Sequence, residues 1–280
     1  MTRHVATPPS EESGNRLSPF RWACSKRKVL SSLAHFWAPH FLRYVEPFAG
    51  SASLYFRLRP TQALLGDINN DLIVAYRVIQ DNPDALAGAL ARFSPSQETY
   101  YHLRDHSGVS TAIERAARFM FLNRYCFNGL YRTNNEGKFN VPWGGKKTGK
   151  LPSLELLRAY SHQLKGARFI AGDFETTLTS VRPGDFVYLD PPYTLTRQRT
   201  FDYSKQQFDF GALWRLKECL NTLQQLKIPF VVSYADSEEG RFLAAGLKTA
   251  RLTVQRHIAG FSSMRRRNRE LLIFPPYLPR

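Results

Sequence analysis

Apolar runs of strand length recur along the chain, and four of them end at an acidic residue. The acids that follow these runs are Glu46, Asp67, Asp173 and Asp190. Two further runs, 230–234 and 271–274, have a similar composition that favours β-strands.

Between these runs, apolar residues recur at helical spacing, as at 72–79 and 213–226. Strands that alternate with helices predict an α/β protein with a mainly parallel, Rossmann-like sheet. Ligands of such sheets bind at the carboxyl ends of the strands, so we expect the four acids to gather at one edge.

The stretch 83–165 departs from this alternation. Residues 84 to about 122 have helical spacing, whereas 123–152 are rich in Asn, Gly, Arg and Lys. Residues 134–137 lie between Tyr131 and Phe139 and predict the turn of a β-hairpin. We expect a helical and β-hairpin region at 83–165, inserted into a sheet domain formed by 19–82 and 166–280, with a disordered tail at 1–18.

Charge indicates the class of partner. The chain of 280 residues has a net charge of +16 and a pI of about 10.0, which favours a polyanion. Charge alone does not separate DNA, RNA and an anionic membrane surface. No stretch is apolar over the roughly 20 residues that a membrane helix needs. Three widely spaced cysteines and no apolar run in 1–18 predict a cytoplasmic protein without a signal peptide.

Asp190, Pro191, Pro192 and Tyr193 follow the run 185–189 and suit methyl transfer to a ring amine. Such an amine is a weak nucleophile, because its lone pair is delocalised into the ring. The Asp190 carboxylate and the Pro191 carbonyl can accept its two N–H groups, and the prolines stiffen the backbone. Tyr193 offers a face for stacking on a base that has left the duplex. The alternative is a Pro-rich turn with Tyr193 in the core.

The loop that begins at Glu46 is a candidate cofactor loop. It contains Phe48 and Gly50 and passes from a predicted strand to a predicted helix. It does not have the GxGxxG pattern, and small-residue loops are common connections.

Two further acids are candidate cofactor contacts. Asp67 fits an acceptor for ribose hydroxyls, or else a helix-capping aspartate. Asp173 and Phe174 can pair an acceptor with an aromatic face for an adenine ring, or form a turn.

Basic residues concentrate in two segments. In 123–150 they alternate with aromatic side chains and Asn, which favours a hairpin that contacts bases and phosphates. The run 264–269 is suited to phosphate contact, with a solvated charged face as the alternative. The histidines have no metal-ligand spacing, so no metal is expected.

The chain resembles the Dam-type family of DNA adenine-N6 methyltransferases from about residue 20 to about 274. Four segments carry this resemblance besides Asp190–Tyr193: 21–26 (RWACSK), 45–53 (VEPFAGSAS), 66–73 (GDINNDLI), and 122–132 with 137–144 (LNRYCFNGLYR and GKFNVPWG). The sequence departs from the family pattern at Cys24, Ser25 and Ala52, where the family has glycines.

The resemblance implies S-adenosylmethionine as the cofactor and double-stranded DNA as the partner, with GATC as the expected site. It implies that Trp22, Lys26, Asp67 and Asp190 contact the cofactor. It also implies that the recognition residues contact DNA, and we expect this of Arg21, Arg124, Asn128, Leu130, Arg132, Asn134 and Pro142.

We therefore expect a monomeric adenine-N6 DNA methyltransferase. Three alternatives remain open at this point: an RNA base methyltransferase, a cytosine-N4 methyltransferase, and a DNA-binding protein with a degenerate pocket.

Overall fold

The computed structural model describes residues 18–22, 29–106, 108, 111–134, 136–145, 148–193, 208–255 and 267–278. Side chains are described except at 253–255 and 267–269. Several sequence predictions fall outside these residues: positions 1–17 of the tail predicted at 1–18, the Lys26 contact, the exchanges at Cys24 and Ser25, and the basic side chains of 264–269. Ser18, the last residue of the predicted tail, is described and is buried.

Seven strands form one sheet in the order β3-β2-β1-β4-β5-β7-β6. The strands are β1 (Arg43–Glu46), β2 (Ala63–Asp67), β3 (Ala167–Ala171), β4 (Asp185–Leu189), β5 (Phe230–Ala235), β6 (Lys248–Gln255) and β7 (Arg267–Phe274). The first five run parallel, and β7 is antiparallel to both of its neighbours. The predicted α/β, Rossmann-like class is confirmed.

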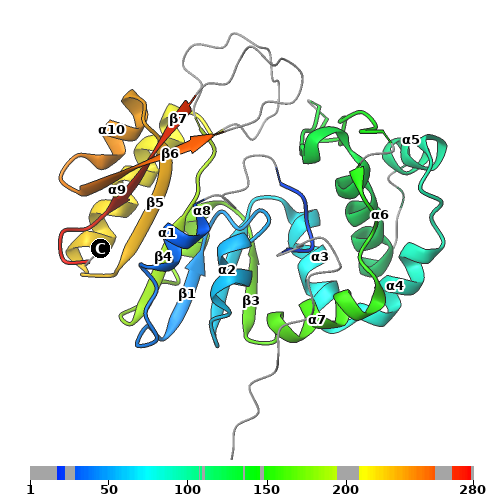
Figure 1. The fold of residues 1–280 in the computed structure, drawn as a ribbon, viewed down its shortest axis with the longest axis horizontal. Helices are drawn as coiled ribbons and strands as arrows, with labels where there is room; N and C mark the ends of the chain where they lie inside the picture. Colours follow the sequence, from blue (N-terminus) through cyan, green and yellow to red (C-terminus); the bar gives the residue numbers. More distant parts are fainter. Residues whose placement is uncertain are drawn as a thin grey trace, which may run out of the picture.

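Helices cover both faces of the sheet, and short ones also connect its strands (Figure 1). They are α1 (Leu30–Ala34), α2 (Ser53–Leu58), α3 (Asn70–Asp81), α4 (Pro83–Ala91), α5 (Gln97–Asp105), α6 (Ala112–Tyr125), α7 (Leu154–Leu164), α8 (Phe174–Leu178), α9 (Phe210–Gln225) and α10 (Glu238–Ala244), with a 3₁₀ turn η1 (Phe127–Gly129).

The alternation of side chains along the strands builds two cores. Tyr44 and Phe186 belong to the core under α1, α2 and α3, while Val45 and Val187 belong to the core under α8, α9 and α10. All four side chains are fully buried because successive strand residues point to opposite faces, and both faces are covered. This explains why the central strands are continuous apolar runs.

Helices α4, α5 and α6 stand together beyond the β3 edge, away from α9 and α10 (Figure 1). Helix α6 begins with a capping box, in which Thr111 and Glu114 satisfy each other's backbone N–H groups. A separate small core joins α5, α6 and the segment 139–143 through side chains that include Tyr100, Phe121 and Val141. The segment 139–143 is therefore supported by a core separate from those of the sheet.

The strands differ from the sequence prediction in two places. The run expected to end at Asp173 ends as a strand at Ala171, because Asp173 accepts a hydrogen bond from the Glu175 N–H and caps α8. Strand β6 was not predicted from the sequence, and it is ordered by its antiparallel pairing with β7 over Lys248–Gln255. A local helix cap decides the first case, and pairing between strands decides the second.

Candidate active site and DNA interface

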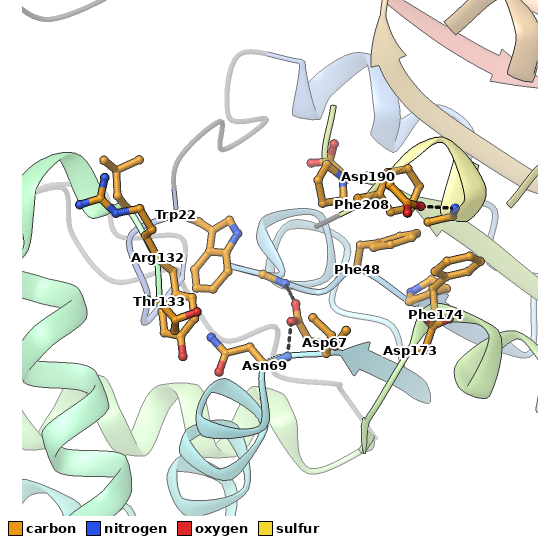
Figure 2. Close-up of a pocket in the computed structure, with 18 of the residues that line it drawn as sticks. Trp22, Phe48, Asp67, Asn69, Arg132, Thr133, Asp173, Phe174, Asp190 and Phe208 are labelled. Atoms are coloured by element: carbon orange, nitrogen blue, oxygen red, sulfur yellow. Dashed lines mark hydrogen bonds between the residues drawn. The ribbon is translucent and has the colours of Figure 1, made fainter. Parts of the chain in front are cut away.

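A cavity of about 580 Å³ lies at the carboxyl edge of the sheet, where the strand order reverses between β1 and β4 (Figure 2). This volume suits a ligand of drug size. Both predicted cofactor residues and predicted DNA residues line it: Trp22, Phe48, Gly50, Asp67, Leu130, Arg132, Asp173, Phe174, Asp190 and Pro192. The fold thus brings together residues that are 170 positions apart, since Trp22 and Pro192 both line the cavity.

Segment 18–22 is held by hydrogen bonds between the loop that follows Glu46, the candidate cofactor loop, and helix α6. The Ser18 hydroxyl donates to the Ser51 carbonyl. The Asn123 side chain accepts from the Arg21 N–H at 2.9 Å and donates to the Arg21 carbonyl at 2.7 Å. This double contact fixes the backbone immediately before Trp22.

Gly50 allows the indole of Trp22 to approach the cofactor loop. Gly50 has φ +46°, and a Cβ there would lie 2.8 Å from Trp22 Nε1. Ala52, two residues on, is also left-handed at φ +47°. This conformation favours glycine, which explains why the related pattern has glycine at position 52.

Asp67 is held by two backbone N–H groups at the end of β2. The Gly50 N–H donates to Oδ2 and the Asn69 N–H donates to Oδ1, both at 2.9 Å. Burial raises the pKa of Asp67, and these two hydrogen bonds partly offset the rise. Each oxygen keeps a second lone pair that can accept from a ligand.

An aromatic cluster forms the opposite end of the cavity. Phe48 stacks on Phe174 with ring centroids 5.3 Å apart, and Phe208 lies edge-on to Phe48 at 5.9 Å. The Arg215 guanidinium lies 5.0 Å from the centre of the Phe174 ring and pairs with Asp173 at 3.2 Å. Asp173 therefore caps a helix and pairs with a cation as well as lining the cavity.

Asp190 follows β4 and receives a hydrogen bond from β5. The Ser233 hydroxyl lies 3.1 Å from Asp190 Oδ1 and 3.0 Å from the Tyr188 hydroxyl. Ser233 and Tyr188 are buried, so this chain of hydroxyls fixes the carboxylate from inside the sheet. The sequence did not predict this contact, although the place of Ser233 toward the carboxyl end of the neighbouring strand was a usable signal.

The three residues after Asp190 differ in how far they are buried. Pro191 is buried, Pro192 is exposed and lines the cavity, and Tyr193 is half-buried beside it. The Tyr193 ring packs edge-on against Tyr234 with centroids 5.1 Å apart, and its hydroxyl lies 3.4 Å from Glu270 Oε1.

Glu46 lies beneath the cavity rather than in its wall. It is only 3% exposed and accepts a hydrogen bond from the Tyr44 hydroxyl at 3.0 Å. Burial raises the pKa of Glu46 well above its ordinary value, and the nearby Asp190 and Asp67 raise it further.

The predicted turn at 134–137 has hairpin hydrogen bonding. Thr133 pairs with Phe139, and the Asn140 N–H donates to the Arg132 carbonyl at 3.0 Å. The Asn134 side-chain oxygen accepts from the backbone N–H groups of Glu136 and Lys138, so it stabilises the turn. Among the described residues of 126–145, β-pairing consists of two isolated bridges rather than full strands.

Four predicted DNA residues are accessible. Asn128, Leu130, Arg132 and Pro142 are exposed, and Asn128 is left-handed with φ +53°. The Arg132 Nε donates to Asn140 Oδ1 at 2.8 Å, which orients its guanidinium.

Arg21 and Arg124, two of the predicted DNA residues, both donate hydrogen bonds to backbone carbonyls of the protein. Arg124 is 6% exposed inside α6, and its Nη2 donates to the Pro19 carbonyl at 3.4 Å. The Arg21 Nη1 donates to the Arg124 carbonyl at 2.8 Å at the end of the same helix. Both guanidinium groups hold segment 18–22 on α6. Arg124 is buried in this position, whereas the DNA contact predicted for Arg21 stays a prediction.

Within the described part of the chain, no three His, Cys, Asp or Glu side chains are grouped so as to hold a metal ion. Across the same residues, no helix has both the length and the apolar character needed to cross a bilayer.

Comparisons with known proteins place this site in context. Residues 22–258 match the sequence profile of the family described as D12 class N6 adenine-specific DNA methyltransferase. The chain is 33% identical to the type II methyltransferase M1.LlaDCHI of Lactococcus lactis subsp. cremoris, over 92% of this chain and 95% of that protein. It is 30% identical to the DNA adenine methylase of Haemophilus influenzae, over 91% and 92%. Identity to the DNA N-6-adenine-methyltransferase of Escherichia phage P1 is 35%, over 72% and 28%.

Proposed function

Because the chain belongs to the D12 class of N6 adenine-specific DNA methyltransferases, we propose that it transfers a methyl group from S-adenosylmethionine to a flipped-out adenine in duplex DNA. Family membership decides between the alternatives that the sequence left open, in favour of an enzyme specific for adenine in DNA. The observation that carries the proposal is Asp190, fixed by Ser233 on the wall of the cavity that Asp67 and Phe174 also line.

The residues of the cavity fit the proposed methyl donor. Asp67 offers acceptor positions for ribose hydroxyls, and Phe48 and Phe174 offer faces for the adenine ring. Gly50 leaves room for close backbone approach beside Trp22. When bound, S-adenosylmethionine supplies an electrophilic methyl group on a sulfonium.

Asp190 and Pro191 prepare the target amine. The Asp190 carboxylate and the Pro191 carbonyl accept the two N–H groups of adenine N6, which directs its lone pair toward the donor. The proton leaves through Asp190, which is the ionisable acceptor of the two. Tyr193 stacks on the flipped base, and its hydroxyl contact with Glu270 anchors the ring.

The inserted region 83–165 is proposed to recognise the DNA, while 19–82 and 166–280 form the catalytic domain. Arg132 and Asn128 contact base edges, and Leu130 and Pro142 shape the fit around them. The resemblance of 122–144 to the recognition hairpin of GATC-methylating proteins supports GATC as the site. The excess of cationic residues supports binding to DNA. We also infer that the protein is a monomer and that it acts in the cytoplasm.

Asp190→Ala tests the catalytic assignment. We expect it to abolish incorporation of radiolabelled methyl groups into duplex DNA while DNA affinity stays within a few-fold of the wild type. The matched control is Asp84→Asn, which removes an exposed acid of α4 that pairs with Arg158 at the surface. Equal loss of DNA binding and methyl transfer in Asp190→Ala would make Asp190 a structural residue.

A second experiment tests the DNA sequence that the protein recognises. Methylation sequencing at base resolution, with DNA from cells that express the protein, should place N6-methyladenine in GATC. Methylation confined to another sequence would overturn GATC and leave the reaction in place. Folded protein that transfers no methyl group to DNA of any sequence would overturn the proposed reaction.

A further inference from the structure

Asn69 lines the cavity, and a hydrogen bond fixes the orientation of its side-chain amide. It is the N-cap of α3, and its Oδ1 accepts the Leu72 N–H at 3.1 Å. Since this bond identifies the oxygen, the other end of the amide must be Nδ2. Figure 2 shows the Asn69 side chain on the side of the cavity toward Trp22 and Thr133.

The Nδ2 group is buried without a partner. Asn69 is 8% exposed and lines the cavity, yet Nδ2 has no hydrogen bond to any residue that the structure describes. Buried side-chain donors are nearly always satisfied in folded proteins, by protein, water or ligand. This donor therefore points to an acceptor that occupies the cavity.

The neighbouring carboxylate identifies the acceptor. The backbone N–H of Asn69 donates to Asp67 Oδ1 at 2.9 Å, so the donor and the carboxylate belong to one small loop. A ribose hydroxyl both donates and accepts hydrogen bonds. Asp67 can take its proton, and Asn69 Nδ2 can donate to its oxygen.

The two arginines of the cavity wall already have partners within the protein. Arg215 pairs with Asp173 and Glu175, and the Nε of Arg132 donates to Asn140. Asn69 is the wall donor directly next to Asp67.

We propose that Asn69 is a cofactor-binding residue whose Nδ2 donates to a ribose hydroxyl oxygen of the adenosyl methyl donor. This inference rests on the proposed donor.

Asn69→Ser separates the two functions of the side chain. Serine is also a good N-cap, so the helix keeps its acceptor, whereas the donor no longer reaches the cavity. The probe is S-adenosylhomocysteine, titrated calorimetrically into the full chain, together with its 2′-deoxy and 3′-deoxy analogues. The matched control is Ser153→Ala, which removes the N-cap of α7, where the Ser153 hydroxyl accepts the Leu156 N–H.

We expect Asn69→Ser to weaken binding of S-adenosylhomocysteine by about 3- to 10-fold, the usual net effect of one hydrogen bond. This loss should disappear with the deoxy analogue that lacks the contacted hydroxyl. Ser153→Ala should lower the Tm and leave the affinity unchanged, which separates loss of a helix cap from loss of the donor.

Equal affinity of the wild type and Asn69→Ser would overturn the inference alone. A loss that persists with both deoxy analogues would also overturn it, because the effect would then come from the shape of the pocket. A folded wild-type protein that binds no S-adenosylhomocysteine would overturn the proposed donor itself, and this inference with it.

Discussion

The indole of Trp22 and the phenol ring of Tyr131 lie nearly parallel, with ring centroids 6.2 Å apart and 11° between their planes. Trp22 also contacts Gly50 of the cofactor loop, while Tyr131 stands between the predicted DNA residues Leu130 and Arg132. The stack is therefore a direct contact between the recognition hairpin and the cavity.

Loss of this stack should affect binding of the cofactor product. An aromatic pair contributes about 0.5–1.5 kcal/mol beyond burial, so Tyr131→Leu should weaken S-adenosylhomocysteine binding by about 2- to 10-fold. Tyr131→Phe keeps the ring and should bind like the wild type. Isothermal titration measures both variants. Wild-type affinity in Tyr131→Leu would show that the stack does not support the cavity.

Ser233→Ala should slow methyl transfer more than it changes binding. The variant removes the donor to Asp190 Oδ1, and one such hydrogen bond corresponds to a decrease in rate of up to about tenfold. Tyr188→Phe is the control, because it removes the outer hydroxyl of the chain and leaves the contact between Ser233 and Asp190 intact. Single-turnover rates with saturating DNA provide the comparison. Equal rates for both variants would mean that the contact with Asp190 has no special role.

Arg132→Ala should relax recognition at one base pair. A bidentate contact to a base edge contributes about 1–3 kcal/mol of discrimination. Asn140→Ala should produce a smaller loss at the same position, since it removes only the acceptor that orients the guanidinium. Competition binding with duplexes that carry single base-pair changes measures both effects. A loss of equal size on every duplex would reassign Arg132 to phosphate.

The raised pKa of Glu46 should make the stability of the protein depend on pH. Burial raises the pKa of its carboxyl well above 4.5 in the folded state. Between the unfolded and folded pKa values the folded state binds more protons, so the free energy of unfolding falls as pH rises. Glu46→Gln removes this titration and keeps an acceptor for Tyr44.

The Tm of the wild type should therefore fall, relative to that of Glu46→Gln, when the pH is raised from about 5 to about 8. Thermal denaturation at several pH values in this window measures the difference. The same difference at every pH would show that the pKa of Glu46 is not raised by folding.

The sequence alone determined the central features of the fold. Parallel strands covered on both faces are continuous apolar runs, and the acid that ends each run must lie at the carboxyl edge. Asp67 and Asp190 could therefore be assigned to one edge without coordinates. The turn at 134–137 could also be predicted, because its composition specifies a local conformation.

Only the tertiary structure decided which side chains those residues meet. Arg21 and Asn123 are 102 positions apart, and nothing in either segment indicates their mutual hydrogen bonds. The burial of Arg124 and the support of Asp190 by Ser233 depend in the same way on how distant elements pack. Local patterns record which face of an element is buried, whereas the partner on that face is set by the docking of elements far apart in the chain.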